Sequence, residues 1–168
     1  MTKTVNKAKE FAKKAHEGQV RKGNGQPYFN HPQTVYEIAK SITDDVSILA
    51  ACYLHDTIED TPINYIDLKN EFGKEIADIV QAVSEDKSIK HWAVRKSEYL
   101  ETVFSNEKAV IVAWADKMHN VADLKTVKDF SVFNETLEEK IKFYRKFADM
   151  MKQRDLKKKL KLLIDNVY

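Results

Sequence analysis

The chain has 168 residues, of which 43% are apolar and 32% are charged. This length is enough to bury about two thirds of the unfolded surface in one core, so residues 1–168 are predicted to form a single domain. Lys and Arg outnumber Asp and Glu by 28 to 26, and the net charge of +2 gives no general electrostatic reason to bind nucleic acid.

The composition also argues against secretion and membrane insertion. The one cysteine, Cys52, cannot form an internal disulfide, and its neighbours Ala51 and Tyr53 are typical of a buried thiol in a reducing compartment. The first residues lack an apolar signal core, and no apolar run approaches the roughly 18 residues that a membrane span needs. We therefore expect a soluble, cytoplasmic protein that binds neither membrane nor nucleic acid.

Helical periodicity dominates the chain, and no alternating apolar run is long enough to predict a sheet. Only four Gly and three Pro interrupt the pattern, so we predict an all-α fold of roughly eight to ten helices. The predicted helices span Val5 to Glu17, Pro32 to Ile42, Asp45 to Glu59, Ile63 to Phe72, Lys74 to Ser84, Ala93 to Ser105, Glu107 to Lys125, Asn134 to Lys152 and Asp155 to Asn166.

Several of these helices carry start or stop signals. Asp45, Asn106 and Asn134 stand at the starts of three predicted helices, where Asx side chains cap free backbone N–H groups. Gly73 separates two middle helices because glycine tolerates a positive φ. The run Lys157 to Lys161 is interleaved with leucines, which predicts a solvated basic face on an amphipathic end helix.

The longest predicted loop runs from Gly18 to Asn30 and holds three of the four glycines together with Pro27. Loops of this size in compact domains are often functional. The loop contains two adjacent basic residues, Arg21 and Lys22, which can grip an anionic ligand.

The segment Tyr53 to Thr61, with the sequence YLHDTIEDT, places a histidine and three carboxylates at the end of an apolar run. If one helix continues through it, His55 lies over Glu59 and Asp56 lies over Asp60. Crowded carboxylates repel one another, and a cation would remove that cost. We therefore predict a divalent metal bound by His55 and Asp56, with Glu59 and Asp60 free to handle water or protons.

Two side chains cannot hold such an ion tightly, so further ligands are needed. His31 precedes Pro32, a residue favoured in the first turn of a helix, so its ring would project from a rigid junction. Asp116 follows the apolar run Val110 to Ala115 and requires a partner, either a cation or a buried Arg or Lys. Two imidazoles and two carboxylates, completed by water, suit Mn²⁺ or Fe²⁺ better than a structural Zn²⁺.

These residues carry a resemblance to a known family. The order of His31, the pair His55-Asp56 and Asp116 matches the H…HD…D pattern of the HD-domain metal phosphohydrolases. From about Ala8 to Leu124 the chain resembles the hydrolase domain of the RelA/SpoT alarmone enzymes. The matching segments are AHEGQ at 15–19, RK at 21–22, PYFNHP at 27–32, LHDTIEDT at 54–61, EFG at 71–73 and ADKMHN at 115–120. Because the chain has no room for the synthetase or regulatory domains of the long members, it is most similar to the small alarmone hydrolases.

The resemblance implies an all-helical HD-domain fold around one Mn²⁺ ion. It also implies removal of the 3′-pyrophosphate from guanosine tetra- or pentaphosphate, giving GDP or GTP. The implied metal ligands are His31, His55, Asp56 and Asp116. The implied water-activating pair is Glu59 and Asp60. The implied nucleotide contacts are Arg21, Lys22, Asn120 and Tyr144.

A second basic segment, Lys87 to Lys96, follows a predicted loop start at Ser84, and at least one of its cations is expected to contact phosphate. Lys90 is the residue that we select. The segment aligns only loosely with the family, and Ala113 replaces a basic residue that the family usually has. Both differences affect the contacts that select the nucleotide.

Two other functions remain open. The chain resembles HD phosphohydrolases in general, so a nucleoside 5′-monophosphate or the 2′-phosphate of NADPH is an alternative substrate. A catalytically inactive nucleotide-binding module is the second alternative. For the remaining histidines, we expect His16 to bond backbone groups, whereas His119 is expected either to support the metal or substrate site or to make an ordinary hydrogen bond.

Overall fold

The computed structural model describes residues 1–127, 130–133 and 135–167. This part of the chain is helical, which confirms the predicted fold class, and its only extended pairing is an isolated antiparallel bridge between Val20 and Pro27. The helices are α1 (Lys3–Ala15), α2 (Asn30–Lys40), α3 (Val46–Leu54), α4 (Thr57–Asp60), α5 (Tyr65–Phe72), α6 (Lys74–Val83), α7 (Trp92–Phe104), α8 (Glu107–Asp123), α9 (Leu137–Met150) and α10 (Arg154–Val167). Two short 3₁₀ turns, Leu124–Thr126 and Phe130–Val132, lie between α8 and α9.

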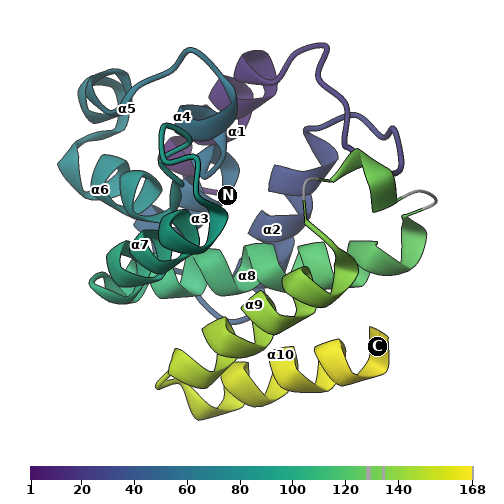
Figure 1. Ribbon diagram of the computed structural model, residues 1–168. Coiled ribbons are helices and arrows are strands. Elements are labelled where there is room, and N and C mark those ends of the chain that lie inside the picture. Colours follow the sequence, from purple (N-terminus) through teal and green to yellow (C-terminus); the bar gives the residue numbers. More distant parts are fainter. Residues whose placement is uncertain (128–129, 134, 168) are drawn as a thin grey trace.

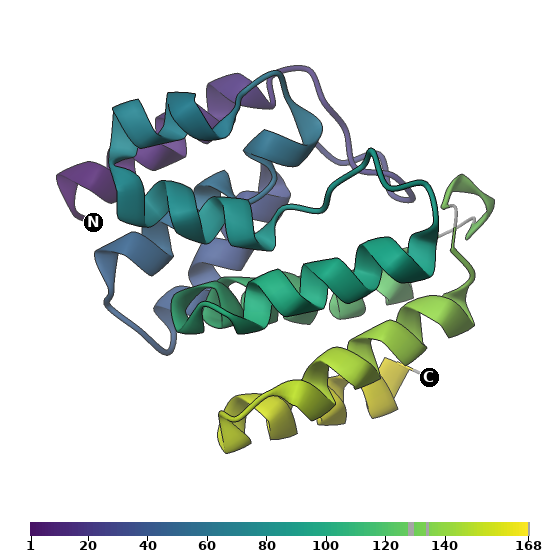
Figure 2. The same ribbon diagram turned by 60° about the vertical axis from the view of Figure 1, so that its left-hand side comes forward.

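Helix α8 crosses the middle of the molecule (Figure 1) and packs against α2, α3, α6, α7 and α10. The pair α9 and α10 forms a layer on one side of α7 and α8, and α1 to α6 lie on the other side (Figure 2). Because α8 lies between these two groups, a side chain near its carboxyl end can meet residues from distant parts of the chain.

Helix α3 is the most deeply buried part of the core. Every residue from Ile48 to Leu54 is buried, including the free thiol of Cys52, as predicted. A helix that is apolar on all sides must be surrounded by other helices, and α3 packs against α1, α2, α6 and α8. No helix in the described ranges is both long and apolar enough to span a bilayer.

The prediction of one continuous helix from Asp45 to Glu59 is wrong. Helix α3 ends at Leu54, and α4 starts at Thr57 after a two-residue turn. His55 and Thr57 cause this break because their side chains bond backbone carbonyls of the preceding turn. The His55 imidazole bonds the Cys52 carbonyl at 2.9 Å, and the Thr57 hydroxyl donates to the Leu54 carbonyl at 2.7 Å. These bonds use acceptors that a continuing helix would need.

The start of α2 also differs from the prediction. The helix begins at Asn30, so His31 lies within its first turn rather than in the preceding loop. Pro32 is tolerated there because the backbone N–H groups of the first turn have no partner in the helix. The ring of His31 is therefore held by the helix itself.

Two of the predicted helix caps are confirmed. The side chains of Asp45 and Asn106 accept backbone N–H bonds at the starts of α3 and α8. The cap predicted at Asn134 lies outside the described residues. Helix α9 begins later than predicted, behind a capping box formed by Thr136 and Glu139.

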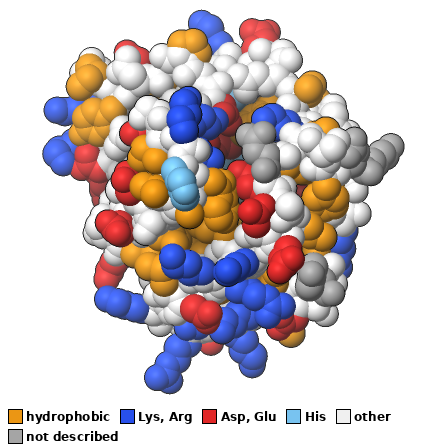
Figure 3. Space-filling view, in the orientation of Figure 1, with side chains coloured by type: hydrophobic (Ala, Val, Ile, Leu, Met, Phe, Trp, Pro, Cys, Tyr) orange, Lys and Arg blue, Asp and Glu red, His pale blue; other side chains and the backbone are white. Residues whose placement is uncertain are grey.

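The end helix has the amphipathic character expected from its lysines and leucines. Leu160 is fully buried, whereas Lys158 and Lys159 are exposed. The indole N–H of Trp114 on α8 donates to the Leu156 carbonyl at 3.0 Å, which ties α10 to the centre of the fold. Figure 3 shows basic side chains gathered at the bottom of the view, where α9 and α10 lie.

Phe147 on α9 provides a test of this packing. It is completely buried, and its ring lies 5.3 Å from that of Phe104 on α7. We expect Phe147→Ala to lower the free energy of unfolding by about 3–5 kcal/mol, because it removes apolar contacts and leaves a cavity. Met150 lies on the same helix and is 40% exposed, so Met150→Ala should change stability by only about 0.5 kcal/mol. Urea unfolding followed by circular dichroism measures both, and equal small effects would contradict this docking of α9.

Candidate active site

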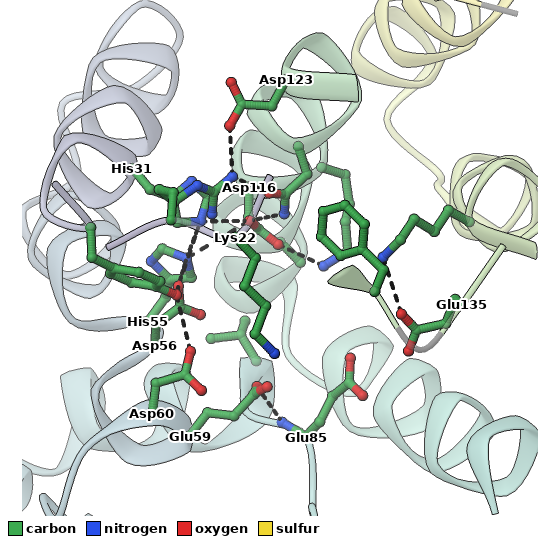
Figure 4. Close-up of a pocket in the computed structure, with 18 of the residues that line it drawn as sticks. Lys22, His31, His55, Asp56, Glu59, Asp60, Glu85, Asp116, Asp123 and Glu135 are labelled. Atoms are coloured by element: carbon green, nitrogen blue, oxygen red, sulfur yellow. Dashed lines mark hydrogen bonds and ion pairs between the residues drawn. The ribbon is translucent and has the colours of Figure 1, made fainter. Parts of the chain in front are cut away.

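Three buried side chains from distant parts of the chain converge inside a cavity (Figure 4). His31 comes from the first turn of α2, His55 from the turn after α3, and Asp116 from α8. Each offers one possible ligand atom, and these atoms all lie within 4.8 Å of one another. The Nε2 atom of His31 lies 3.1 Å from that of His55 and 3.1 Å from Oδ1 of Asp116. This His-His-Asp group can hold a metal ion.

Asp56, the fourth predicted ligand, faces the same centre. Its Oδ2 atom lies 3.1 Å from Nε2 of His55 and 3.5 Å from Nε2 of His31. The break between α3 and α4 places His55 and Asp56 in one turn, with both side chains directed at His31. Metal binding by Asp56 stays a prediction.

The hydrogen bonds of the two imidazoles indicate which nitrogen atoms carry protons. Nδ1 of His55 bonds a carbonyl, which can only accept, so Nδ1 carries a proton and Nε2 faces the centre. Nδ1 of His31 lies 2.6 Å from Nδ1 of His119. We assign the shared proton to His31, because Asp123 lies 3.6 Å from the other nitrogen of His119 and favours a proton there.

With this assignment, the atoms that meet at the centre are imidazole nitrogens and carboxylate oxygens. When both imidazoles are neutral, each of these atoms has a lone pair directed at the centre, which is the donor set of a divalent cation site. The second nitrogen of each imidazole is anchored by a hydrogen bond, as in protein metal sites generally. The residues therefore fit a metal ion.

The chain itself can supply one positive charge at this centre. Burial lowers the pKa of His31 to about 4. Burial also acts to lower the pKa of His55, but the carboxylates of Asp56 and Asp116 outweigh it and raise that pKa to about 9. A proton on His55 therefore balances the carboxylates, and a bound metal ion would displace it.

Asp116 has two kinds of partner at once. Its Oδ1 atom faces His31, and its Oδ2 atom accepts a hydrogen bond from the buried ammonium of Lys117 at 2.7 Å. Lys117 also bonds the hydroxyl of Tyr99 at 2.9 Å. Burial acts to raise the pKa of Asp116, but Lys117 and the histidines hold it well below its usual value. Both partners considered from the sequence, a buried lysine and a cation-binding centre, are therefore present.

The predicted acidic pair lies on α4, beside Asp56. Burial, reinforced by the charge of Asp56, raises the pKa of Glu59 to about 7. The Glu59 carboxylate accepts the backbone N–H of Glu85 at 3.1 Å. The ammonium of Lys87 lies 3.3 Å from Glu59 and also pairs with Asp60. The acidic pair thus lies between the histidines and a basic loop residue. Asp60 stays one helical turn from Asp56, because its backbone N–H donates to the Asp56 carbonyl at 2.9 Å.

Arg21 and Lys22 have different environments. The guanidinium of Arg21 donates to Asp123 at 2.8 Å and to Asn120 at 3.0 Å, and the amide of Asn120 donates to Asp116. Lys22 is exposed and forms no ion pair within the described part of the chain. Its side chain extends into the cavity (Figure 4). Of the two predicted contacts, Lys22 therefore has the unengaged charge.

The two remaining predicted contacts also differ. Tyr144 on α9 lines the cavity and is nearly buried, and its hydroxyl makes no hydrogen bond with the described residues. Lys90 is exposed and is not part of the cavity wall, whereas Lys87 of the same loop is. A phosphate contact by Lys90 stays a prediction without structural support.

The cavity has a volume of about 680 Å³ and brings these groups together with several that sequence reasoning missed. Lys117 could have been noticed as a lysine that follows a predicted ligand in an apolar helix. Tyr28 belongs to the PYFNHP segment, but nothing in its spacing indicated that its hydroxyl contacts Asp56 and Asp60. Glu85, which pairs with Lys96 on α7, carried no sequence signal.

The structure also places the two histidines whose roles were open. The nearest polar partner of His16 is the side chain of Gln19, at 2.8 Å, so the expected backbone bond is wrong. His16 is buried, and its ring stacks on Tyr28. His119 bonds His31, which fits the expected supporting role rather than a separate hydrogen bond.

Comparison with known proteins agrees with this geometry. A family model described as an HD domain matches residues 8–158. The chain therefore belongs to the HD-domain family. Within it, the chain is similar to small alarmone hydrolases, as the sequence resemblance predicted.

Two relatives are guanosine-3′,5′-bis(diphosphate) 3′-pyrophosphohydrolases named MESH1. The Danio rerio protein is 37% identical over 74% of this chain and 68% of its own length, and the Homo sapiens protein is 33% identical over 70% and 67%. The bifunctional (p)ppGpp synthase/hydrolase SpoT of Escherichia coli is 32% identical over 81% of this chain. The chain spans about a fifth of the length of SpoT and about two thirds of MESH1. The solved structure of a metazoan SpoT orthologue that hydrolyses ppGpp matches with a TM-score of 0.82 and 26% identity, over 99% of this chain and 94% of the other.

Asp116 provides a test of the metal centre. We expect Asp116→Asn to remove most of the divalent metal that copurifies with the protein, because an amide loses the negative charge at the centre. Asp116→Ala should also lower the free energy of unfolding by about 3–5 kcal/mol, because it leaves Lys117 buried without its partner. Elemental analysis of both variants measures the metal. Asp78→Asn, on the exposed face of α6, is the control, and wild-type metal content in Asp116→Asn would contradict the site.

Proposed function

We propose that this protein hydrolyses the 3′-pyrophosphate of guanosine tetra- or pentaphosphate, releasing pyrophosphate and GDP or GTP, and so degrades the alarmone of the stringent response. The observation that carries the proposal is the convergence of His31, His55 and Asp116 in a cavity that also holds an acidic pair and an unengaged lysine. The relatives named as pyrophosphohydrolases support the choice of substrate. The proposed unit is one catalytic domain over residues 1–168.

The proposed cofactor is one Mn²⁺ ion per chain, held by His31, His55, Asp56 and Asp116. Mixed nitrogen and carboxylate ligands suit this ion, which when bound lowers the pKa of water and neutralises phosphoryl oxygens. The imidazoles are anchored in advance by Cys52 and His119, so ligand orientation costs little on binding.

In the proposed reaction, Glu59 and Asp60 orient the attacking water and accept its proton. A general base works best when its pKa is near the working pH, and Glu59 has a pKa of about 7 because it is buried beside Asp56. Its carboxylate is fixed by the backbone N–H of Glu85. The raised pKa and this hydrogen bond support Glu59 as the proposed base.

The substrate is a polyanion, and the proposed cation for its phosphates is Lys22. This ammonium forms no ion pair with the described residues, so binding phosphate does not require breaking an existing contact. Arg21 is proposed to shape the nucleotide pocket through Asn120 rather than to act as a free charge. Tyr144 offers a hydroxyl with an unused donor at the cavity wall.

The decisive experiment is a nucleotide panel. Purified protein is incubated with Mn²⁺ and, separately, ppGpp, pppGpp, NADPH and AMP, and the products are separated by anion-exchange chromatography. We expect GDP and pyrophosphate from ppGpp, and none when a chelator is present. Phosphate release from NADPH or AMP with ppGpp untouched would establish a different HD phosphohydrolase. Tight ppGpp binding without turnover would establish an inactive binding module.

The acidic pair gives a second prediction, with a defined pH dependence. Glu59 must be ionised to accept a proton, so kcat/KM should rise with pH up to a pKa of about 7 and then level off. Glu59→Gln should remove this limb and lower turnover at least about 100-fold, and adding Asp60→Asn should abolish the remainder. Glu98→Gln, on the exposed side of α7, is the control. A double variant that keeps wild-type turnover with the same pH profile would refute this assignment.

A further inference from the structure

Tyr28 lies at the wall of the candidate site and is held there by several contacts. Its backbone N–H donates to the Gln19 carbonyl at 2.9 Å, and its own carbonyl accepts the N–H of His31 at 2.9 Å. The ring stacks on the buried imidazole of His16, with centroids 4.7 Å apart, and the guanidinium of Arg21 lies 5.9 Å from the ring centroid. The position of the hydroxyl is therefore fixed by the loop and not by the groups that it contacts.

This hydroxyl bridges two carboxylates with different proposed roles. It lies 2.6 Å from Oδ2 of Asp56 and 3.0 Å from Oδ2 of Asp60. The contacted oxygen of Asp56 is the same atom that faces the imidazoles of His55 and His31. A carboxylate oxygen has two lone pairs, so it can accept a hydrogen bond from Tyr28 and still bind a cation. Burial and the two carboxylates raise the pKa of Tyr28, so the phenol stays neutral and keeps its proton.

The other contacts of Asp60 cannot replace this bridge. Its second carboxylate oxygen pairs with Lys87, whose side chain is 54% exposed. Its backbone carbonyl accepts from the Gln19 side chain at 2.9 Å, which positions the backbone and leaves the carboxylate free to turn. Of the groups that touch this carboxylate, Tyr28 alone is held by backbone bonds and ring stacking within the described residues.

We propose that Tyr28 is a positioning residue that sets the distance between the proposed metal ligand Asp56 and Asp60 of the acidic pair through its single hydroxyl. This inference rests on the function proposed above. Fixing Asp60 relative to the metal fixes it relative to the attacking water, and small errors in such geometry have large effects on rate. The hydroxyl contacts the two carboxylates, so its loss should affect turnover more than substrate binding.

The test is Tyr28→Phe, which removes one oxygen and keeps the stacking on His16. At saturating Mn²⁺ with ppGpp as substrate, we expect kcat to fall about 10–100-fold, as is typical when a residue that hydrogen-bonds a metal ligand is mutated. KM should stay within about threefold of wild type. Raising Mn²⁺ further should not restore kcat. In isothermal titration, Mn²⁺ should bind about tenfold more weakly, because Asp56 loses its partner.

Tyr53→Phe is the matched control. Tyr53 is buried in α3, and its hydroxyl bonds Gln33 at 3.2 Å, outside the cavity wall. This variant also loses one phenol hydroxyl. Because that hydroxyl lies outside the cavity wall, the variant should keep wild-type kcat and Mn²⁺ affinity. A general packing defect would instead appear in both variants.

The outcomes separate this inference from the proposed function. If the wild-type protein hydrolyses ppGpp, a wild-type kcat in Tyr28→Phe, or a kcat restored by excess Mn²⁺, overturns the role of Tyr28 alone. If the wild-type protein leaves ppGpp intact, the proposed function fails and the titration decides the inference. Unchanged Mn²⁺ affinity in Tyr28→Phe would then overturn it, and a loss of affinity absent from Tyr53→Phe would support the link to Asp56.

Discussion

The site depends on one electrostatic constraint: buried lone pairs from three segments are directed at the same point. Imidazole nitrogens of His31 and His55 face carboxylate oxygens of Asp56 and Asp116 at distances of 3.1 to 3.8 Å. Such a group is unfavourable in a buried setting unless positive charge is placed within it. The fold holds the ligands in spite of this cost, because α3 and α8 are packed on several sides and the second atoms of the ligands are already bonded. The free energy of packing therefore stabilises a centre that is ready for a cation.

The same constraint extends from the centre to the loop before α2. From Arg21, one path runs through Asn120 to Asp116, and another runs through Asp123 and His119 to His31. Residues near the carboxyl end of α8 thus join a loop residue to two of the candidate ligands. A displacement of the loop would disturb the orientation of both ligands, so the position of the loop is coupled to the geometry of the candidate metal site. This explains why the guanidinium of Arg21 is bonded to protein groups.

Periodicity predicted the helical class, and the dense cluster around His55 predicted a metal site, because both are local signals. The convergence with His31 and Asp116 followed from the family resemblance, because these residues lie far apart in the chain. The prediction of one continuous helix failed because side chains bond backbone groups and override the local preference for helix. The break at His55 arises because His55 and Thr57 bond carbonyls of their own turn, and an apolar run gives no sign of such competition. The contacts of Tyr28 and Lys117 depend on how distant helices pack, which pairwise spacing cannot reveal. The partners of Arg21 gave no sequence signal for the same reason, since they lie about 100 residues away along the chain. Its contact with the nucleotide stays a prediction.

The charges of the cavity favour the proposed binding of a metal ion before the proposed phosphorylated substrate. Seven carboxylates and six Lys or Arg side chains belong to the described cavity wall. With His55 protonated, the wall has no net charge, and most of its basic groups are already paired with acids. With all seven carboxylates ionised, exchange of the His55 proton for a divalent ion would make the wall net positive, and the added charge would lie deep in the cavity, where screening by salt is weak. The proposed phosphorylated substrate would then meet both the ion and Lys22, which favours binding of the metal first.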